Sequence, residues 1–453
     1  MDTNAFVEKL KEGDCKIAVA YKSEAITYRE LYENIMRVSR RLEKHNISGT
    51  SVLLVGNYSI NSICMLLALW MNKNVVALTS SENKGRIKGL ADSAGARFCI
   101  YDDAKAWETR IVDTLSSNTP PNISKLISNN ESGFVVFSSG STGPAKGVVH
   151  RVNPFLERYS EAERIDSILA FLLFDHIGGL VTMLHALATH GTLVIPVERS
   201  LDEVGRCIKK YSIRTLHVSP TLLQLALISG VLHKWNTQNL QRIYYGSEPI
   251  SPELIRQVEK AMPNIELRQL YGMSEIGVLP CSSRDGDSRW MNIQDPNYSV
   301  KIIDGILHVR GAMNMVGYLS DDSMLPINSY FNTSDLAEED GGYFFVKGRS
   351  TDLINVGGSN VCPTDVERIL GGIANVVDVM VYGHSNPIIG EVVAARFVLS
   401  ETEDLEKFKG RVYKEIKDVL LPEEIPRVIS ISDSYSYTER FKKVRNTKVR
   451  AAL

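Results

Sequence analysis

Cysteine is scarce in this sequence, and its few copies are scattered. The 453-residue chain has six cysteines, at Cys15, Cys64, Cys99, Cys207, Cys281 and Cys362. None of them forms a C-x-x-C pair, and no cluster of histidines lies beside them. This spacing argues against a disulfide framework and against a zinc site, and it fits a protein of the reducing cytoplasm.

The chain also lacks an excess of charge of one sign and a long apolar run. Its 51 basic and 53 acidic residues nearly cancel, which gives no reason to expect nucleic acid or an anionic membrane as a partner. The most apolar run, residues 63–71, is about half as long as a membrane-spanning helix. The N-terminus has no basic stretch followed by an apolar one. The sequence therefore predicts a cytoplasmic protein with no membrane span and no secretory signal.

Predicted strands and helices alternate along much of the chain. Runs rich in β-branched and apolar residues predict strands at 51–55, 75–78, 98–101, 192–196, 215–218, 243–245 and 265–270. Helices are predicted after the capping box of Thr27 and Glu30, over the apolar run 61–71, and after the Ser-Pro pairs at Ser219 and Ser251. This alternation indicates an α/β fold with mostly parallel sheets and flanking helices. Ligands of such sheets bind beyond the carboxyl ends of the strands.

The segment from Gly133 to His150 is the most distinctive in the chain. It reads G-F-V-V-F-S-S-G-S-T-G-P-A-K-G-V-V-H, which is an apolar strand, a polar loop and a second apolar strand. Glycines allow close backbone approach, N–H groups and hydroxyls donate hydrogen bonds, and the lysine adds positive charge, so phosphate is the expected ligand. The candidate residues are Ser138, Ser139, Gly140, Ser141, Thr142, Gly143 and Lys146.

Two other interpretations of this loop were weighed. A flexible turn that happens to be rich in small residues is the structural alternative. A Walker A loop is excluded because Lys146 is followed by Gly147 and an apolar run, where that motif requires Ser or Thr and a helix.

Two predicted strands end in glycine-containing tails. The first tail consists of Gly246, Ser247, Glu248 and Pro249, and it reads as a turn into the next helix. The second consists of Tyr271, Gly272, Met273, Ser274 and Glu275. It offers an aromatic face, close backbone approach, a hydroxyl and a carboxylate. An ordinary Tyr-Gly turn and a helix-capping serine are the alternatives.

The loop from Ser138 to Gly147 resembles the signature loop of the adenylate-forming superfamily. That superfamily contains acyl-CoA and aryl-CoA synthetases, luciferase-like enzymes and the adenylation domains of peptide synthetases. The two tails resemble its adenine-pocket motifs. The resemblance implies that Tyr271 stacks on the adenine base, that the 246–249 backbone borders the base, and that Glu275 and Thr142 hold magnesium.

Two later segments resemble further motifs of the superfamily in the same order. The first reads F-N-T-S-D-L and the second G-R-S-T-D. The resemblance implies that Asp335 binds the ribose hydroxyls of ATP and that Arg349 lies near the ribose and phosphate. Ser334 stands where the family usually has glycine, and it is expected to tighten the local turn. Ser274 replaces the usual threonine and keeps the hydroxyl.

The resemblance also implies two domains with a hinge just after Arg349. Residues 1–350 would form a large N-terminal domain that holds the ATP and acid pocket. Residues 351–453 would form a small mobile α+β domain. A capping box from Thr364 to Glu367 predicts a new helix in this small domain.

A catalytic lysine is expected near the C-terminus. The superfamily ends in a motif whose lysine reaches the substrate carboxylate and the α-phosphate. Counting forward from Thr438 selects Lys442, whereas counting back from Arg450 selects Lys443. We favour Lys443, although Phe441 or Lys442 stands in place of the family glycine.

The segment 172–180 is the candidate for the acid side of the site. It reads L-L-F-D-H-I-G-G-L and resembles a CoA-ligase motif whose histidine lies at the acid pocket, which would be His176. A structural histidine is the plainer alternative. In another alignment, Asp175 would pair with the ammonium of an amino acid, but residues 177–180 continue the CoA-ligase pattern. The candidate pocket residues are Phe174, His176, Ser219, Tyr244 and Met273.

The predicted function is ATP-dependent activation of a small carboxylic acid to an acyl-AMP, with release of pyrophosphate. Transfer to a thiol then gives a thioester. The expected cofactors are ATP, Mg²⁺ and CoA, with the phosphopantetheine arm of an acyl carrier protein as the alternative acceptor. Transfer to an amine, and a nucleotide-binding regulatory protein that has lost turnover, stay open.

Overall fold

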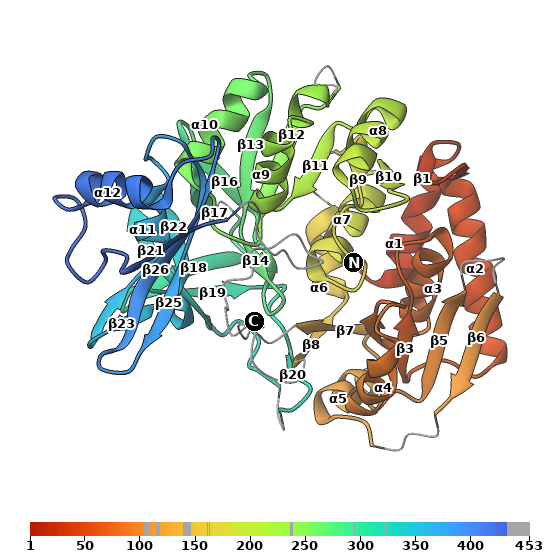
Figure 1. Cartoon of the computed structure of the whole chain (residues 1–453). Helices are drawn as coiled ribbons and strands as arrows, with labels where there is room; N and C mark the ends of the chain where they lie inside the picture. The colour runs from red at the N-terminus through yellow and green to blue at the C-terminus, as the bar shows by residue number, and fades with distance from the viewer. Residues whose placement is uncertain are drawn as a thin grey trace.

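The computed structural model describes residues 1–103, 108–114, 118–138, 146–160, 162, 164–235, 239–293, 295–321 and 324–432. Four main sheets and their helices make up this part of the chain (Figure 1). Within it, no helix combines the length and the apolar character that crossing a bilayer would need.

The first seven-stranded sheet has the order β13-β12-β11-β9-β10-β1-β2. Its strands are β1 (Ile17–Tyr21), β2 (Glu24–Thr27), β9 (Ser167–Leu169), β10 (Thr192–Ile195), β11 (Thr215–Val218), β12 (Arg242–Gly246) and β13 (Glu266–Leu270). All neighbours pair in parallel except β1 and β2. The parallel strands β11, β12 and β13 therefore end at one edge, where both predicted tails begin.

The second seven-stranded sheet has the order β20-β8-β7-β4-β3-β5-β6. Its strands are β3 (Ser51–Val55), β4 (Val75–Thr79), β5 (Phe98–Asp103), β6 (Glu108–Asp113), β7 (Gly133–Ser138), β8 (Lys146–Arg151) and β20 (Gly317–Tyr318). Strand β3 pairs in parallel with β4 and β5, and β4 pairs in parallel with β7. Strands β7 and β8 are antiparallel, so the glycine-rich segment is a hairpin at the side of this sheet.

The helices that pack on these sheets are α1 (Thr3–Lys9), α2 (Tyr28–Lys44), α3 (Ile60–Met71), α4 (Ile87–Ser93), α5 (Pro121–Ser128), α6 (Asn153–Ser160), α7 (Ile177–Ala188), α8 (Leu201–Tyr211), α9 (Pro220–Ile228) and α10 (Pro252–Ala261). The predicted capping box of Thr27 and Glu30 is present at α2. Ser219 and Ser251 cap α9 and α10, each with proline at the first helical position. Because α3 is apolar on nearly every face, it is buried in the core.

A third sheet, of six strands, was not predicted as a unit. Its order is β16-β17-β22-β21-β19-β18, and its described pairs are antiparallel. The strands are β16 (Cys281–Arg284), β17 (Asp287–Ile293), β18 (Tyr298–Ile303), β19 (Ile306–Gly311), β21 (Phe331–Asp340) and β22 (Tyr343–Arg349). A short hairpin of β14 (Gly272–Met273) and β15 (Gly277–Val278) precedes it. Many of its side chains are only half buried, so the apolar runs that mark a buried strand are missing.

The chain from Ile354 to Ile431 builds a separate sheet, at the left of Figure 1. Its order is β24-β23-β26-β25, with β27 paired to β26. Its elements are β23 (Ile354–Val356), β24 (Ser359–Val361), α11 (Pro363–Leu370), β25 (Val376–Asn386), β26 (Gly390–Leu399), α12 (Leu405–Ile416) and β27 (Val428–Ile431). A core of its own, which includes Phe397 and Phe408, holds this C-terminal unit together.

The capping box predicted at Thr364 is wrong. The helix begins two residues earlier, with Cys362 at the N-cap and Pro363 at the first helical position. The Thr364 hydroxyl donates to the carbonyl of Lys347 in β22, and the Glu367 carboxylate accepts from the backbone N–H of Val381. Both side chains of the expected box therefore bind other elements, because proline sets the helix start.

Candidate functional site

Asp335 and Arg349 lie opposite each other on β21 and β22. The two residues are register partners, and Nε of Arg349 lies 3.6 Å from Oδ1 of Asp335. Tyr271, from the tail after β13, donates its hydroxyl to Oδ2 of Asp335 at 2.6 Å. Side chains of three separate predicted motifs thus meet at one carboxylate.

Burial affects the pKa values of both Asp335 and Tyr271. Burial raises the pKa of Asp335, while the hydrogen bond from Tyr271 and the charge of Arg349 oppose that rise. Burial also raises the pKa of Tyr271, and the nearby Asp335 adds to the effect. The phenol therefore stays protonated and acts as a donor. The Arg349 side chain is 59% exposed, so its guanidinium can still meet a ligand.

Ser334 adopts the backbone conformation that a glycine would adopt at little cost. Its φ is +60°, and its N–H donates to Oδ1 of Asn332 at 2.8 Å. A non-glycine residue in the left-handed region costs about 1 kcal/mol. The serine therefore keeps the turn that presents Asp335, with some backbone strain.

The backbone of the second tail is pinned by β8. Nε2 of His150 lies 2.6 Å from the carbonyl oxygen of Ser274. His150 is buried and stacks on Phe134, with ring centres 4.9 Å apart. Burial lowers the pKa of His150 to about 4, so the ring is neutral at neutral pH. Sequence reasoning assigned no role to this histidine, which ends the glycine-rich segment and joins it to the adenine-pocket tail.

Glu275 is held through both its backbone and its side chain. Its carbonyl oxygen accepts from the N–H of Met315 at 2.7 Å, and its Oε1 accepts from the hydroxyl of Tyr318 at 3.0 Å. Lys146, at the start of β8, lies with Nζ 5.4 Å from the centre of the same tyrosine ring. The carboxylate predicted to hold magnesium and the lysine predicted to hold phosphate therefore share a neighbour that was not predicted.

Part of the glycine-rich loop lies outside the described residues. This is true of Ser139, Gly140, Ser141, Thr142 and Gly143. The ends of the loop are described, and Ser138 pairs with Lys146 across the β7–β8 hairpin.

The first tail serves mainly to connect its neighbours. A Cβ at Gly246 would lie 2.5 Å from the carbonyl oxygen of Leu270, so only glycine fits beside β13. Ser247 has a φ of +73°, and Oε1 of Glu248 accepts from the N–H of Thr221 at 2.8 Å. The tail, which ends at Pro249, is thereby fixed to the start of α9.

On the acid side, residues of segment 172–180 contact neighbouring elements of the fold. The Phe174 ring is buried and packs on Tyr58, with ring centres 5.1 Å apart. Oδ2 of Asp175 accepts from the N–H of Ser80 at 2.9 Å. His176 is the N-cap residue of α7, with Nε2 4.0 Å from Oδ1 of Asp175. The carboxylate of Asp175 thus fixes the loop after β4.

Of the other acid-pocket candidates, Ser219 directly follows β11, Tyr244 lies in β12 and Met273 lies in β14. Ser219 is buried and its hydroxyl caps α9, while the Tyr244 ring meets His217 edge-on at 5.1 Å. His217 also lies 2.9 Å, through Nδ1, from the hydroxyl of Thr182 in α7. Burial lowers its pKa to about 3, so it is neutral. His217 was missed from the sequence; it links the helix that starts at His176 to the strand that carries Tyr244.

Comparison with known proteins decides the family. The model of the family described as AMP-binding enzyme matches residues 6–319. The chain belongs to the AMP-binding enzyme family. The predicted superfamily is thereby confirmed.

Relatives of this AMP-binding enzyme with assigned functions include two 2-succinylbenzoate–CoA ligases of Staphylococcus aureus. The protein of strain bovine RF122 / ET3-1 is 26% identical over 487 residues, which covers 95% of this chain and 96% of the relative. The protein of strain MSSA476 is 27% identical with the same coverage.

Solved structures similar to this AMP-binding enzyme share its fold. The anthranilate CoA ligase AuaEII in complex with anthranoyl-AMP has a TM-score of 0.82 at 17% identity, covering 98% of this chain and 95% of that one. ATP-bound MatB from Rhodopseudomonas palustris has a TM-score of 0.77 at 20% identity, covering 97% of each chain. The amide bond synthetase McbA from Marinactinospora thermotolerans has a TM-score of 0.76 at 19% identity, covering 96% of this chain and 97% of that one. The predicted α/β fold class is confirmed.

The donor set of this AMP-binding enzyme fits magnesium better than a metal that needs a full protein cage. Among the described residues, no group of three or more His, Cys, Asp or Glu side chains could hold a metal ion. Magnesium is commonly held by one or two carboxylates together with substrate phosphates. Glu275, which accepts one hydrogen bond through Oε1, retains lone pairs for such an ion.

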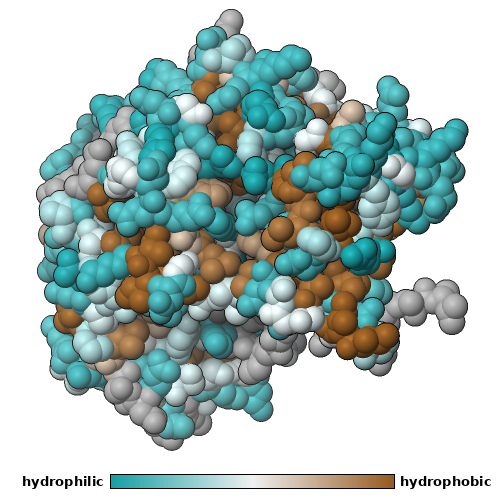
Figure 2. All heavy atoms as spheres, turned by 90° about the vertical axis from the view of Figure 1, so that its left-hand side faces the viewer, coloured by the Kyte–Doolittle hydropathy of each residue, from teal (hydrophilic) through white to brown (hydrophobic). Residues whose placement is uncertain are grey.

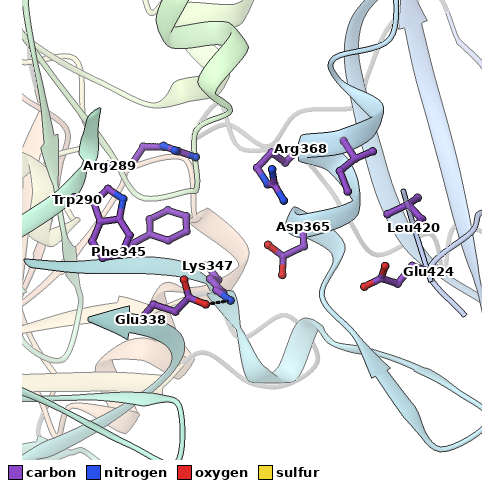
Figure 3. Close-up of a pocket in the computed structure, with 10 residues that line it drawn as sticks. Arg289, Trp290, Glu338, Phe345, Lys347, Asp365, Arg368, Leu420 and Glu424 are labelled. Carbon is purple, nitrogen blue, oxygen red and sulfur yellow. Dashed lines mark ion pairs between the residues drawn. The ribbon is translucent and has the colours of Figure 1, made fainter. Parts of the chain in front are cut away.

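A cleft of about 480 Å³ lies apart from these residues (Figure 3). The third sheet lines one side and the C-terminal unit the other; the labelled residues are Arg289, Trp290, Glu338, Phe345, Lys347, Asp365, Arg368, Leu420 and Glu424. Acidic and basic side chains are balanced there, and Lys347 forms an ion pair with Glu338. Among the residues that the structure describes, none of the predicted nucleotide or acid site lines this cleft between the two parts of the chain.

Proposed function

We propose that this AMP-binding enzyme is an acid–CoA ligase. It activates a carboxylic acid with ATP to an acyl-AMP, releases pyrophosphate, and transfers the acyl group to the thiol of CoA. The predicted enzyme class, with ATP and CoA, is borne out by the family and by the CoA ligases among the relatives.

The observation that carries the proposal is the meeting of motif residues at Asp335. A carboxylate that a phenol orients beside an exposed guanidinium suits the hydroxyls of a ribose and a neighbouring phosphate. Glu275 and Lys146, which share Tyr318, suit a magnesium-bound polyphosphate. Both arrangements serve the nucleotide, as an adenylating enzyme requires.

Each predicted site residue keeps its role as part of this proposal. Tyr271 to Ser274 and Gly246 to Pro249 border the adenine, Asp335 and Arg349 bind the ribose and phosphate, and Glu275 and Thr142 hold magnesium. The loop residues Ser138, Ser139, Gly140, Ser141, Thr142, Gly143 and Lys146 hold the departing pyrophosphate. Lys442 and Lys443 lie outside the described residues, and Lys443 remains the proposed catalytic lysine.

The protein acts mainly by positioning and by neutralising charge. The acid carboxylate attacks the α-phosphorus, so two anionic groups must be brought together and pyrophosphate must leave. Magnesium would supply positive charge at the phosphates. Lys443 would bridge the carboxylate and the α-phosphate, and Lys146 would offset charge on the leaving group. Such electrostatic effects are commonly the largest contribution to catalysis of group transfer.

A domain boundary at residues 350 and 351 belongs to the same proposal. It rests on the separate core of the C-terminal unit and on the cleft in Figure 3. Two hydrogen bonds cross the boundary: Thr364 donates to the carbonyl of Lys347, and Nε2 of Gln224 donates to the carbonyl of Val377 at 3.3 Å. Polar contacts can be exchanged for water, which suits a domain that reorients between two half-reactions.

We propose an aryl acid of the 2-succinylbenzoate class as the substrate. The relatives named for that acid cover nearly the whole chain. The aromatic rings of Phe174 and Tyr244 on the acid side are compatible with a planar acid. A cytoplasmic location stays a prediction.

The test is pyrophosphate release from MgATP across a panel of aryl, aliphatic and amino acids, each with and without CoA. Release that one acid class induces and that CoA accelerates supports the ligase. Release that ignores CoA would point to another acceptor. ATP binding without release for any acid would contradict the ligase and favour a regulatory protein.

A carrier-protein thiol is the second candidate acceptor. Figure 2 views the molecule from the side of the C-terminal unit and shows apolar side chains gathered between hydrophilic ones. In that unit, Ile388 is 89% exposed, Val419 61% and Leu421 58%. Exposed apolar groups commonly mark protein contacts. Acyl transfer to a purified phosphopantetheinylated carrier protein, in competition with CoA, decides between the acceptors.

A further inference from the structure

Tyr318 contacts both the proposed magnesium ligand and the proposed phosphate lysine. Its hydroxyl donates to Oε1 of Glu275 at 3.0 Å, and Nζ of Lys146 lies 5.4 Å from its ring centre. We propose that Tyr318 is a positioning residue for adenylation, which orients the Glu275 carboxylate toward magnesium and holds Lys146 through its ring. The inference rests on the proposed function, because it deepens the description of the same site.

The strand that carries Tyr318 is firmly placed. Strand β20 pairs with β8, with Gly317 opposite Val149. The carbonyl of Tyr318 accepts from Nδ2 of Asn122 at 2.9 Å, and its N–H donates to Oδ2 of Asp321 at 2.7 Å. With its backbone bound on both sides, Tyr318 offers a fixed point for the Glu275 carboxylate.

Glu275 takes its orientation from this same segment. The N–H of Met315 binds its carbonyl oxygen, and three residues later Tyr318 binds its carboxylate. A free glutamate side chain loses rotamer freedom when it binds a metal, and that loss weakens the binding. The tyrosine removes part of that freedom in advance.

The ring of Tyr318 has a separate effect on Lys146. An ammonium group within about 6 Å of a ring centre is attracted to the face of the ring. Lys146 lies within that range, at the start of the strand that pairs with β20. The hydroxyl and the ring therefore serve different partners, and substitutions can separate them.

Tyr318→Phe removes the hydroxyl and keeps the ring. We expect the magnesium concentration for half-maximal adenylation to rise about fivefold, as expected for one hydrogen bond, with KM for the acid unchanged. Calorimetric titration with ATP should show a similar loss of affinity in the presence of Mg²⁺ and none in its absence. Tyr318→Leu removes the ring as well, so ATP affinity should then fall even without Mg²⁺.

Tyr330→Phe is the matched control. The Tyr330 hydroxyl also forms a hydrogen bond, to Ser299 at 3.0 Å, and its ring also lies near a lysine, Lys301, at 4.5 Å. It should leave both the magnesium dependence and ATP affinity as in the unmodified protein. A general loss of packing would instead lower the melting temperature of Tyr318→Phe, which we expect to stay unchanged.

Two results would overturn the inference: unchanged magnesium dependence in Tyr318→Phe, or an equal loss of ATP affinity with and without Mg²⁺. The calorimetry needs no turnover, so it separates this inference from the proposed function. If the protein binds MgATP but releases no pyrophosphate with any acid, the ligase proposal fails, while the two binding curves still support or overturn the role of Tyr318.

Discussion

The proposed nucleotide side and the proposed acid side of the site are built differently. On the nucleotide side, candidate residues bind one another, as Tyr271 binds Asp335. On the acid side, candidates bind their own scaffold: Ser219 caps α9, and Asp175 holds the loop at Ser80. A ribose, its phosphates and a metal ion can be held by polar chemistry of this kind. The fit of an acid depends instead on the shape left between packed elements.

The largest expected effect is at Lys443, the lysine that we propose to contact both the acid and the nucleotide. Lys443→Ala should lower the rate of adenylation by about a hundredfold or more, because charge on the carboxylate and α-phosphate is no longer offset. Transfer of a preformed acyl-AMP to CoA should continue. Both half-reactions are measured by rapid quench, with Lys442→Ala as the control. An equal loss in both half-reactions would contradict the role, and a loss in the control alone would move it to Lys442.

The two sides each contain one buried neutral histidine, so the folding stability of the protein should fall at low pH. In the folded protein the pKa of His150 is about 4, below its usual 6.5, so the unfolded chain binds more protons between these values. Stability is therefore retained above pH 6.5 and lost as the pH falls toward 4. Between pH 7 and 5 the loss from His150 should be about 2 kcal/mol.

Urea unfolding at both pH values measures this loss. His150→Gln, which keeps a donor for the Ser274 carbonyl, should unfold with a weaker pH dependence. His217→Gln is the matched variant on the acid side, since the pKa of His217 is lowered to about 3. If both variants keep the full pH dependence, neither histidine is buried in its neutral form as described.

A nucleotide-side change should leave the acid side unaffected. Asp335→Asn keeps the size of the side chain and an acceptor for Tyr271, but it removes the charge offered to the ribose hydroxyls. KM for ATP should rise about tenfold, as expected for loss of a charge-assisted hydrogen bond, with KM for the acid unchanged. Asp340→Asn, on the exposed end of the same strand, is the control. A matching rise in KM for the acid would contradict the claim that Asp335 serves only the nucleotide.

The smallest expected effect is that of a substitution on the acid side, which should leave the nucleotide side unaffected. Tyr244→Leu removes the ring that meets His217, so it should change the ratio of kcat/KM between a large and a small aryl acid by about fivefold. KM for ATP should stay constant. Tyr382→Leu, in the C-terminal unit, provides the control. A constant acid ratio together with a changed KM for ATP would place Tyr244 on the nucleotide side.

Much of the nucleotide side could be predicted from the sequence because its chemistry requires particular residue types at particular places. Asp335 and Tyr271 were named as members of separate motifs, and the fold brings them into contact. The tertiary partners were not predictable in this way. Tyr318 and Glu275 are 43 positions apart, and His150 and Ser274 are 124 apart, so no local pattern records their contacts.

The fold shows the same limit. Several strands of the parallel sheets are continuous apolar runs and were found, as in β3 and β4. Strands β1 and β9 of the first sheet were not predicted. The antiparallel sheet from β16 to β22 has many half-buried side chains, and only Phe344 to Val346 stood out within it. The capping pattern at Thr364 does not form a capping box, because Pro363 starts the helix and the threonine hydroxyl donates to the carbonyl of Lys347.

The central claim is that the acid carboxylate attacks the α-phosphorus of ATP before the thiol acts. The most direct measurement uses the acid that gives the fastest pyrophosphate release, labelled with heavy oxygen in its carboxylate, in a complete reaction with MgATP and CoA. Mass spectrometry of the products should find one labelled oxygen in AMP and none in pyrophosphate. Label in pyrophosphate or in inorganic phosphate, or unlabelled AMP beside a formed thioester, would contradict the account.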